Sequence, residues 1–142
     1  MLKINKKVEY AMMVLKFIAT KDSSELVTAR DICTKFKTPF DSTAKVMQKL
    51  NSEKILVSAK GIKGGYAINK SLSQISYLDL VKIIEGNDVG RVCITSKGDC
   101  ENLQVCNIVG PVEILNKKVA SFLGSIKLEQ LLFSSPINKH IL

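Results

Sequence analysis

The chain of 142 residues has a single histidine, His140, close to its carboxyl end. Ser/His/Asp and Cys/His catalytic arrangements need a histidine base held beside the nucleophile, so neither arrangement is credible here. We therefore predict that the protein is not an enzyme. No apolar run approaches the ~18 residues that cross a bilayer, so we expect no membrane-spanning helix. Internal repeats and low-complexity tracts are also missing.

Two sequence signals of other protein classes are absent as well. The glycine-rich segment 60–65 is not followed by the GKS or GKT of a Walker loop, which excludes nucleotide binding of that kind. The amino terminus is basic and then apolar, but Glu9 interrupts it early and no small-residue cleavage site follows. We read this segment as a helix rather than a signal peptide, and we predict a cytoplasmic protein.

Positive charge is plentiful and unevenly distributed. The net charge is +8, and 46% of the residues are hydrophobic, which is enough for a packed core. Residues 1–87 carry 15 Lys or Arg against 8 Asp or Glu, whereas residues 88–142 carry 6 against 5. The basic first part of the chain is therefore the candidate surface for a polyanion.

Hydrophobic periodicity predicts three helices in this basic part, over about residues 6–20, 28–36 and 41–51. The second helix opens with a capping box at Thr28, and Pro39 marks a tight turn before the third helix. Two short helices joined by such a turn are typical of a helix-turn-helix. We expect these residues in the core of the motif: Ala29, Ile32, Cys33 and Phe36 of the second helix, together with Met12, Met13 and Met47.

A β-hairpin is predicted directly after the third helix. Two short strand candidates, 55–59 and 66–68, flank the basic, glycine-rich loop 60–65. A hairpin in this position is a wing. The predicted fold class is therefore mainly α, a winged helix-turn-helix with a two-stranded β wing.

The remaining chain adds a fourth helix, an irregular segment and a long helix. Ser76 opens the fourth helix with a second capping box, and Gly86 ends it. From residue 106 to residue 123 an apolar seam recurs at helical spacing, and a short last helix follows. A lone helix with such a seam needs a partner, so we predict a homodimer through this long C-terminal dimerisation helix. The predicted units are 1–86, the DNA-binding domain; 87–105, a cysteine-bearing loop; and 106–142, the dimerisation helix with the last short helix.

The predicted DNA-binding residues lie on the helix-turn-helix and the wing. Side chains at the start and outer face of the third helix can reach base edges or phosphates in a major groove, and wing lysines can neutralise phosphates. An ordinary solvated helix face and a plain hairpin tip are the alternatives. The residues assigned to DNA are Thr28, Asp41, Ser42, Thr43, Lys45, Lys49, Lys60, Lys63 and Gly64.

Three of the four cysteines, Cys93, Cys100 and Cys106, lie in one polar segment, separated by six and five residues. These gaps are too wide for a typical zinc knuckle, whose thiolates are two to four residues apart. They suit a loop that wraps an iron–sulfur cluster and leaves one iron position for a further ligand. Free thiols, or one disulfide with a spare cysteine, are the alternatives. Cys33 is expected to pack in the core.

The chain resembles the Rrf-two family of bacterial transcription regulators. The resemblance rests on the runs Val8–Ala11, Thr38–Val46, Lys60–Tyr66 and Ile126–Leu128, combined with the three cysteines. It implies a homodimer with winged helices, crossed long dimerisation helices and a cluster held by Cys93, Cys100 and Cys106.

The resemblance also bears on the fourth cluster ligand. Where IscR-like members have a histidine, three residues after the third cysteine, this chain has Val109. Another branch uses an acidic residue of the first helix, which is Glu9 here. The resemblance therefore implies Glu9, reaching across the dimer, as fourth ligand of a 2Fe–2S or 4Fe–4S cluster.

Together these features predict a homodimeric regulator whose binding to a double-stranded DNA operator is controlled by the cluster, in response to redox state, nitric oxide or iron–sulfur status. A redox or iron–sulfur carrier without specific DNA binding is one alternative. A regulator whose thiols form a metal-free disulfide switch is another.

Overall fold

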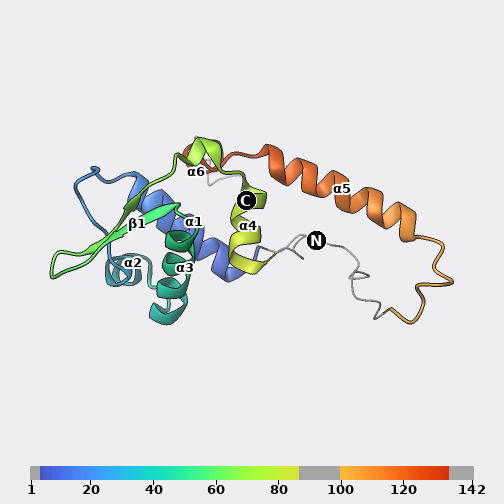
Figure 1. Cartoon of the computed structure of the whole chain (residues 1–142), viewed down its shortest axis with the longest axis horizontal. Helices are drawn as coiled ribbons and strands as arrows, with labels where there is room; N and C mark the ends of the chain where they lie inside the picture. Colours follow the sequence, from blue (N-terminus) through green and yellow to red (C-terminus); the bar gives the residue numbers. More distant parts are fainter. Residues whose placement is uncertain (1–3, 87–99, 135–142) are drawn as a thin grey trace, which may run out of the picture.

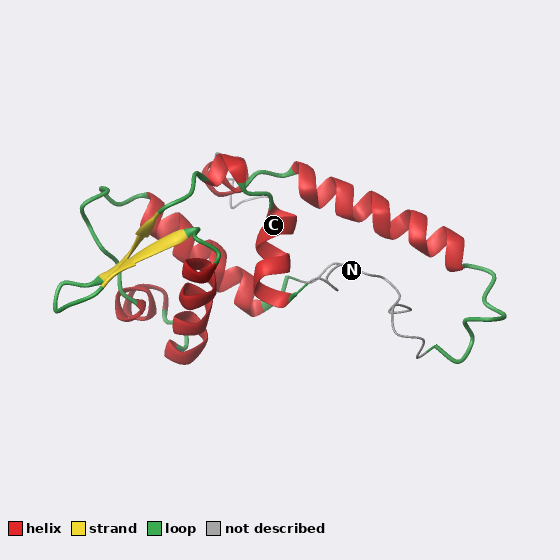
Figure 2. Ribbon diagram, viewed as in Figure 1, coloured by secondary structure: helices red, strands yellow, loops and turns green. Residues whose placement is uncertain are grey.

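The computed structural model describes residues 4–86 and 100–134. These residues form a mainly helical fold with one two-stranded antiparallel sheet, as predicted (Figures 1 and 2). None of the described helices is long and apolar enough to cross a membrane. The elements in chain order are α1 Lys6–Ala19, α2 Ala29–Phe36, α3 Phe40–Ser52, β1 Leu56–Ala59, β2 Gly65–Ile68, the 3-10 helix η1 Leu72–Gln74, α4 Tyr77–Glu85, α5 Val109–Ser125 and α6 Leu128–Phe133.

Helix α1 is the central element of the core. Asn5 caps its first turn by accepting a hydrogen bond from the backbone N–H of Lys7 at 2.9 Å. Its buried stripe packs against α3, α4, β2 and α6. Each large apolar side chain removed from water in this core stabilises the fold by roughly 1.5–3 kcal/mol. The largest fully buried apolar side chains are Leu15, Ile32, Met47, Leu50, Ile55, Leu56, Leu80 and Leu128.

The wing is a short hairpin whose register pairs Leu56 with Ile68 and Ser58 with Tyr66. A third segment joins it, because Val27 and Tyr66 exchange backbone hydrogen bonds of 3.0 and 2.8 Å. This bridge places Val27, two residues before the start of α2, beside the wing. The wing is therefore connected to the helix-turn-helix at two places. One is the chain that leads from α3 into β1, and the other is the bridge between β2 and the segment before α2.

Helix α4 begins at the predicted capping box. The Ser76 hydroxyl accepts from the Asp79 N–H at 3.0 Å, and the Asp79 carboxylate accepts from the Ser76 N–H at 2.9 Å. The helix ends at Gly86, whose φ of 100° favours glycine.

Helix α6 returns to this body at the start of α4. The N–H of Tyr77 donates to the carbonyl of Ile126 at 2.8 Å, and Leu128 is fully buried. The packing therefore groups α6 with the winged helix, although the sequence assigned it to a separate unit, 106–142.

Helix α5 extends away from the winged-helix body (Figure 1). It starts at Val109, three residues later than expected, and Pro111 occupies its first turn, where a missing N–H costs nothing. None of its residues is buried, and Leu115 and Phe122 of the predicted seam are 46% and 65% exposed. Among the described elements, α4 alone makes substantial contact with it.

Two predicted core residues are instead exposed. Phe36 and Met13 are each 37% exposed. The ring of Phe36 packs edge-on against Phe17 at the rim of the core, with ring centroids 5.5 Å apart. Met13 faces a groove described below, whereas Met47 is fully buried as expected.

Candidate functional site

The first helix of the helix-turn-helix motif starts at a complete capping box. The Thr28 hydroxyl donates to the Asp31 carboxylate at 2.8 Å and accepts from the Asp31 N–H at 3.2 Å. The Thr28 N–H donates to the same carboxylate at 2.7 Å, and this backbone hydrogen bond is the main reason why the pKa of Asp31 is lowered. Thr28 was predicted to contact DNA. In this geometry its hydroxyl proton is already used, so it cannot also donate to a phosphate.

The turn between α2 and α3 is held by buried hydroxyl groups. Lys37 adopts the left-handed conformation that ends α2, and Pro39 precedes α3. The Thr43 hydroxyl donates to the Pro39 carbonyl at 2.8 Å and is hydrogen-bonded to the Thr38 hydroxyl, also at 2.8 Å. The Thr38 hydroxyl lies 3.7 Å from Sγ of Cys33, which is half-buried.

The prediction that Thr43 contacts DNA is therefore wrong. Its side chain is fully buried, on the same helical face as Val46, Met47 and Leu50. The position lies three and four residues before Val46 and Met47, so helical periodicity alone could have revealed its burial. Its role is to fix the start of α3 to the turn.

The outer face of α3 carries the other predicted residues. Asp41 and Lys45 are exposed and Ser42 is half-buried, so all three side chains are accessible at the first half of the helix. Phe40, which the sequence reasoning missed, is 51% exposed at the first helical position. An exposed apolar side chain there can contact a thymine methyl group in a major groove.

Lys49 has a different partner from the one predicted. Its ammonium donates to the backbone carbonyl of Ile84 at 2.8 Å, near the end of α4. The last four carbonyls of a helix lack partners within the helix, and the negative end of the helix dipole favours a cation there. This contact directs the Lys49 ammonium toward α4, and its contact with DNA stays a prediction.

The wing tip presents two exposed lysines, Lys60 and Lys63, with a fully exposed Ile62 between them. Gly64 is required by the hairpin itself. A Cβ atom at Gly64 would lie 2.5 Å from the carbonyl oxygen of Ala59, closer than real contacts allow. The tight return of the loop therefore requires glycine at this position, whether or not Gly64 also contacts DNA.

The thiol segment is only partly described. Cys100 and Cys106 are half-buried free thiols on the turns that precede α5, and Cys93 lies outside the described residues. Nowhere in residues 4–86 and 100–134 do three potential metal-ligating side chains come together. A single copy of the chain therefore does not group Cys100 and Cys106 with Glu9 in the part that the structure describes.

Glu9 lies on α1 at the edge of an apolar groove of about 610 Å³. Its carboxylate accepts a hydrogen bond from Lys6 at 2.8 Å, and this bond raises the pKa of Lys6. The groove is formed by α1, the end of α5 and α6. Its lining residues are Ile4, Glu9, Met12, Met13, Lys16, Tyr77, Leu123, Ile126, Leu131 and Leu132.

Comparison with known protein families identifies the family of this chain. The model of the Rrf2 family, described as iron-dependent transcriptional regulators, matches residues 4–134. The chain belongs to the Rrf2 family. Its Rrf2 relatives include the transcriptional regulator NsrR of Bacillus licheniformis, which is 26% identical over 123 residues covering 86% of this chain and 84% of that protein. NsrR of Oceanobacillus iheyensis is also 26% identical, over 84% of this chain and 80% of its own.

Solved structures agree on the Rrf2 fold. CymR, the global cysteine regulator of B. subtilis, superposes with a TM-score of 0.71 over 96% of this chain and all of its own, at 21% identity. IscR of T. potens superposes with a TM-score of 0.66 over 99% and 97%, at 18% identity. The predicted family and winged-helix fold are confirmed. Because these relatives are transcriptional regulators, the prediction that the chain is not an enzyme is confirmed too.

Proposed function

We propose that this chain is a homodimeric repressor or activator of transcription whose affinity for an operator is set by an iron–sulfur cluster. The observation that carries the DNA-binding part is the outer face of α3. Asp41, Ser42 and Lys45 are accessible on it, and the wing lysines Lys60 and Lys63 are exposed as well. Cytoplasmic location remains part of the proposal.

The dimer follows from the surface that one copy leaves uncovered. Helix α5 has no buried residue, and its large apolar side chains Ile114, Leu115 and Phe122 are exposed. The groove beside Glu9 adds apolar surface that reaches the end of α5. A second copy would cover this surface and would bring its own thiol segment toward the groove. This arrangement supports Glu9 as a ligand supplied across the dimer.

The donor set fits a cluster. Cys93, Cys100 and Cys106 would supply three thiolates and Glu9 of the other subunit a carboxylate, which makes up the four protein ligands of a 2Fe–2S or 4Fe–4S cluster. When bound, such a cluster would supply sensitivity to oxidants or nitric oxide. The chain's own contribution is to hold two of these thiols, half-buried, at the base of α5.

A metal-free thiol switch is the second candidate. Cys100 and Cys106 are both free, with five residues between them, on the same stretch of turns. A CymR structure from Staphylococcus aureus, described as an oxidised form, superposes with a TM-score of 0.68. Iron and sulfide analysis of protein purified without oxygen separates the two candidates.

Operator binding is tested with genomic fragments in a gel shift at several salt concentrations. A preferred fragment whose binding weakens steeply with salt supports the regulator. Lys45→Gln and Lys63→Gln should each lower the magnitude of the salt slope by about 1, because each removes one phosphate contact. Equal affinity for all fragments would favour the redox-carrier alternative.

The role of Glu9 is tested by Glu9→Ala. We expect a changed visible spectrum and faster loss of the cluster. Glu53→Ala, which removes an exposed carboxylate at the end of α3, is the matched control and should leave both unchanged. An unaltered spectrum and unaltered cluster lifetime in Glu9→Ala would refute the ligand assignment.

A further inference from the structure

The tip of the wing carries an apolar side chain that no part of the described chain covers. Ile62 is 107% exposed, and the next most exposed large apolar side chain in residues 4–86 and 100–134, Val105, is 81% exposed. The wing lies at one end of the molecule, and α5 extends toward the other (Figure 1). Dimerisation through the seam of α5 therefore does not account for the exposure of Ile62.

The backbone of the wing tip holds Ile62 outward. The Gly64 N–H donates to the Gly61 carbonyl at 3.0 Å, so residues 61–64 form a β-turn whose two central residues are Ile62 and Lys63. Such positions are usually occupied by Gly, Pro, Asn, Asp or Ser. An isoleucine there gains no packing from the described residues, which indicates a contact outside the chain.

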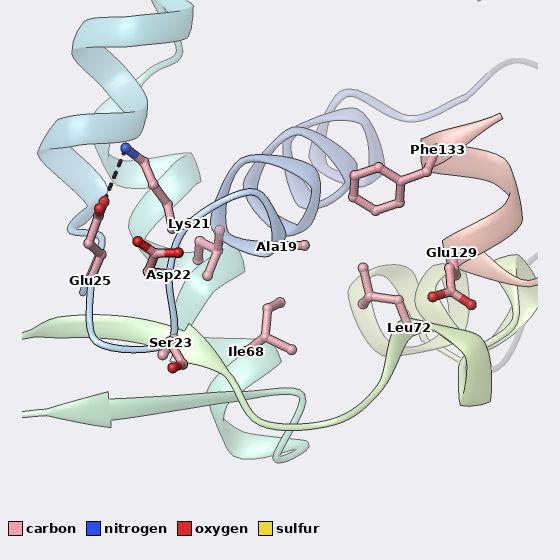
Figure 3. Close-up of a pocket in the computed structure, with 11 residues that line it drawn as sticks. Ala19, Lys21, Asp22, Ser23, Glu25, Ile68, Leu72, Glu129 and Phe133 are labelled. Atoms are coloured by element: carbon pink, nitrogen blue, oxygen red, sulfur yellow. Dashed lines mark ion pairs between the residues drawn. The ribbon is translucent and has the colours of Figure 1, made fainter. Parts of the chain in front are cut away.

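The base of the wing is anchored to the body. Lys21 and Glu25 form an ion pair of 3.3 Å in the loop beside β2 (Figure 3). This loop leads to Val27, which pairs with Tyr66. At the far end of β2, Ile68 points into the space between the end of α1 and η1 (Figure 3). The tip therefore projects from a fixed base, and a preorganised tip loses little conformational freedom on binding.

Positive charge surrounds Ile62. Lys60 and Lys63 are exposed on either side of it, and residues 54–78 contain four lysines and no aspartate or glutamate. Such a tip attracts a polyanion. In the minor groove of DNA, phosphates line both edges and base pairs form the floor. Two lysines that flank an apolar side chain are complementary to this arrangement.

We propose that the wing tip enters the minor groove of the operator and that Ile62 wedges between two adjacent base pairs, while Lys60 and Lys63 contact phosphates on either side. An apolar side chain inserted in this way partly unstacks a base step and kinks the duplex by roughly 20–90°. Pyrimidine–purine steps such as TA unstack most easily, so Ile62 selects such a step without a hydrogen bond to a base. This role rests on the proposed DNA-binding function and adds a specificity-determining residue to it.

The test uses the full chain and the preferred operator fragment, with 2-aminopurine in place of the adenine of each TA or CA step in turn. The fluorescence of this base rises when it is unstacked. We expect a rise at one such step in each half-site, and a bend of the fragment in a circular-permutation gel shift. Ile62→Ala should abolish both signals and lower operator affinity about tenfold. The salt slope should stay unchanged, because no charge is lost.

Three controls accompany this variant. Ile62→Met keeps a long apolar side chain and should keep the fluorescence rise and the bend. Val57→Ala shortens an exposed apolar side chain of β1, away from the tip, and should also leave both signals unchanged. Replacing the responsive step by GC should weaken binding about tenfold for the parent chain and much less for Ile62→Ala. Urea unfolding should be the same for Ile62→Ala and the parent chain, because Ile62 is fully exposed.

A preferred fragment that is bound without a fluorescence rise and without a bend would overturn the wedge and leave the proposed regulator standing. Persistence of both signals in Ile62→Ala would have the same consequence. If no fragment is preferred at any salt concentration, the proposed regulator fails and the wedge fails with it.

Discussion

Lys49 of α3 donates a hydrogen bond of 2.8 Å to the carbonyl of Ile84, thirty-five residues later in the chain. The contact joins the recognition helix to the end of α4, directly before the segment that leads to Cys93. We propose that this contact gives Lys49 a positioning role, which a direct contact with DNA would make unnecessary.

Replacing Lys49 by methionine should lower the free energy of unfolding by about 1 kcal/mol, because the Ile84 carbonyl loses its charged donor while the aliphatic stem is kept. Operator affinity should fall, since α3 is less firmly held. The salt dependence of binding should stay as in the parent chain, because no phosphate contact is lost. Urea unfolding and gel shifts at several salt concentrations measure these effects.

Lys45→Met is the matched control for this variant. Lys45 is exposed on the outer face of the same helix, so its loss should leave the unfolding free energy nearly unchanged and reduce the salt slope by about 1. If Lys49→Met instead lowers the salt slope and leaves stability unaltered, Lys49 contacts DNA as predicted from the sequence and does not position α3.

Thr43→Val tests the buried hydroxyl network of the turn. Valine keeps the shape of threonine but leaves the Pro39 carbonyl and the Thr38 hydroxyl without this partner, so we expect a loss of about 1–2 kcal/mol of stability. Operator affinity should decrease as well, because the start of α3 is less well fixed. The neighbouring Ser42→Ala should weaken DNA binding with little change in stability. Equal stability of Thr43→Val and the parent chain in urea would contradict this role.

The two capping boxes predict a pH dependence of stability. Backbone hydrogen bonds from Thr28 and Ser76 lower the pKa values of Asp31 and Asp79 below their ordinary value. A lowered pKa in the folded state stabilises the fold above the unfolded-state pKa, and this contribution is lost as the pH falls through the folded-state pKa.

The variant Asp31→Asn/Asp79→Asn should therefore be less stable than the parent chain at about pH 6, and the difference should shrink toward about pH 2. Urea unfolding over this range measures the difference. A difference that stays constant with pH would show that the carboxylate charges are not responsible.

The exposed seam of α5 predicts the oligomeric state. Leu115→Glu places a charge on the seam and should convert a dimer into a monomer in sedimentation velocity experiments, because a buried unpaired carboxylate is costly. Glu113→Lys reverses a charge on the opposite side of the helix from Leu115 and Phe122 and should leave the dimer intact. A parent chain that sediments as a monomer, or a dimer that survives Leu115→Glu, would contradict the proposed interface.

Local signals made much of this fold predictable. The capping boxes at Thr28 and Ser76 depend on residues three positions apart, and the wing turn depends on glycine, so each can be recognised in a short window of sequence. The bridge between Val27 and Tyr66 and the contact between Lys49 and Ile84 join residues distant in the chain, and no periodicity reveals them.

The candidate site was less predictable than the fold. Helical periodicity could have shown that Thr43 is buried, but the exposure of Phe36 and Met13 depends on which elements cover them. The three thiols are evident in the sequence, whereas the described part of one copy does not bring Cys100 and Cys106 together with Glu9.

The central claim is that a cluster bound by the three thiols sets the affinity for DNA. The most direct measurement is the dissociation constant for the preferred operator fragment, determined without oxygen for iron- and sulfide-containing protein, for chelator-stripped protein and for Cys106→Ser, with Cys33→Ala as the control. We expect bound iron and sulfide in the parent chain and in Cys33→Ala. We also expect operator affinities of the loaded and stripped forms that differ by about 5- to 150-fold, with Cys106→Ser behaving as the stripped form. Absence of iron and sulfide from the parent chain, or equal operator affinity in all forms, would contradict the account.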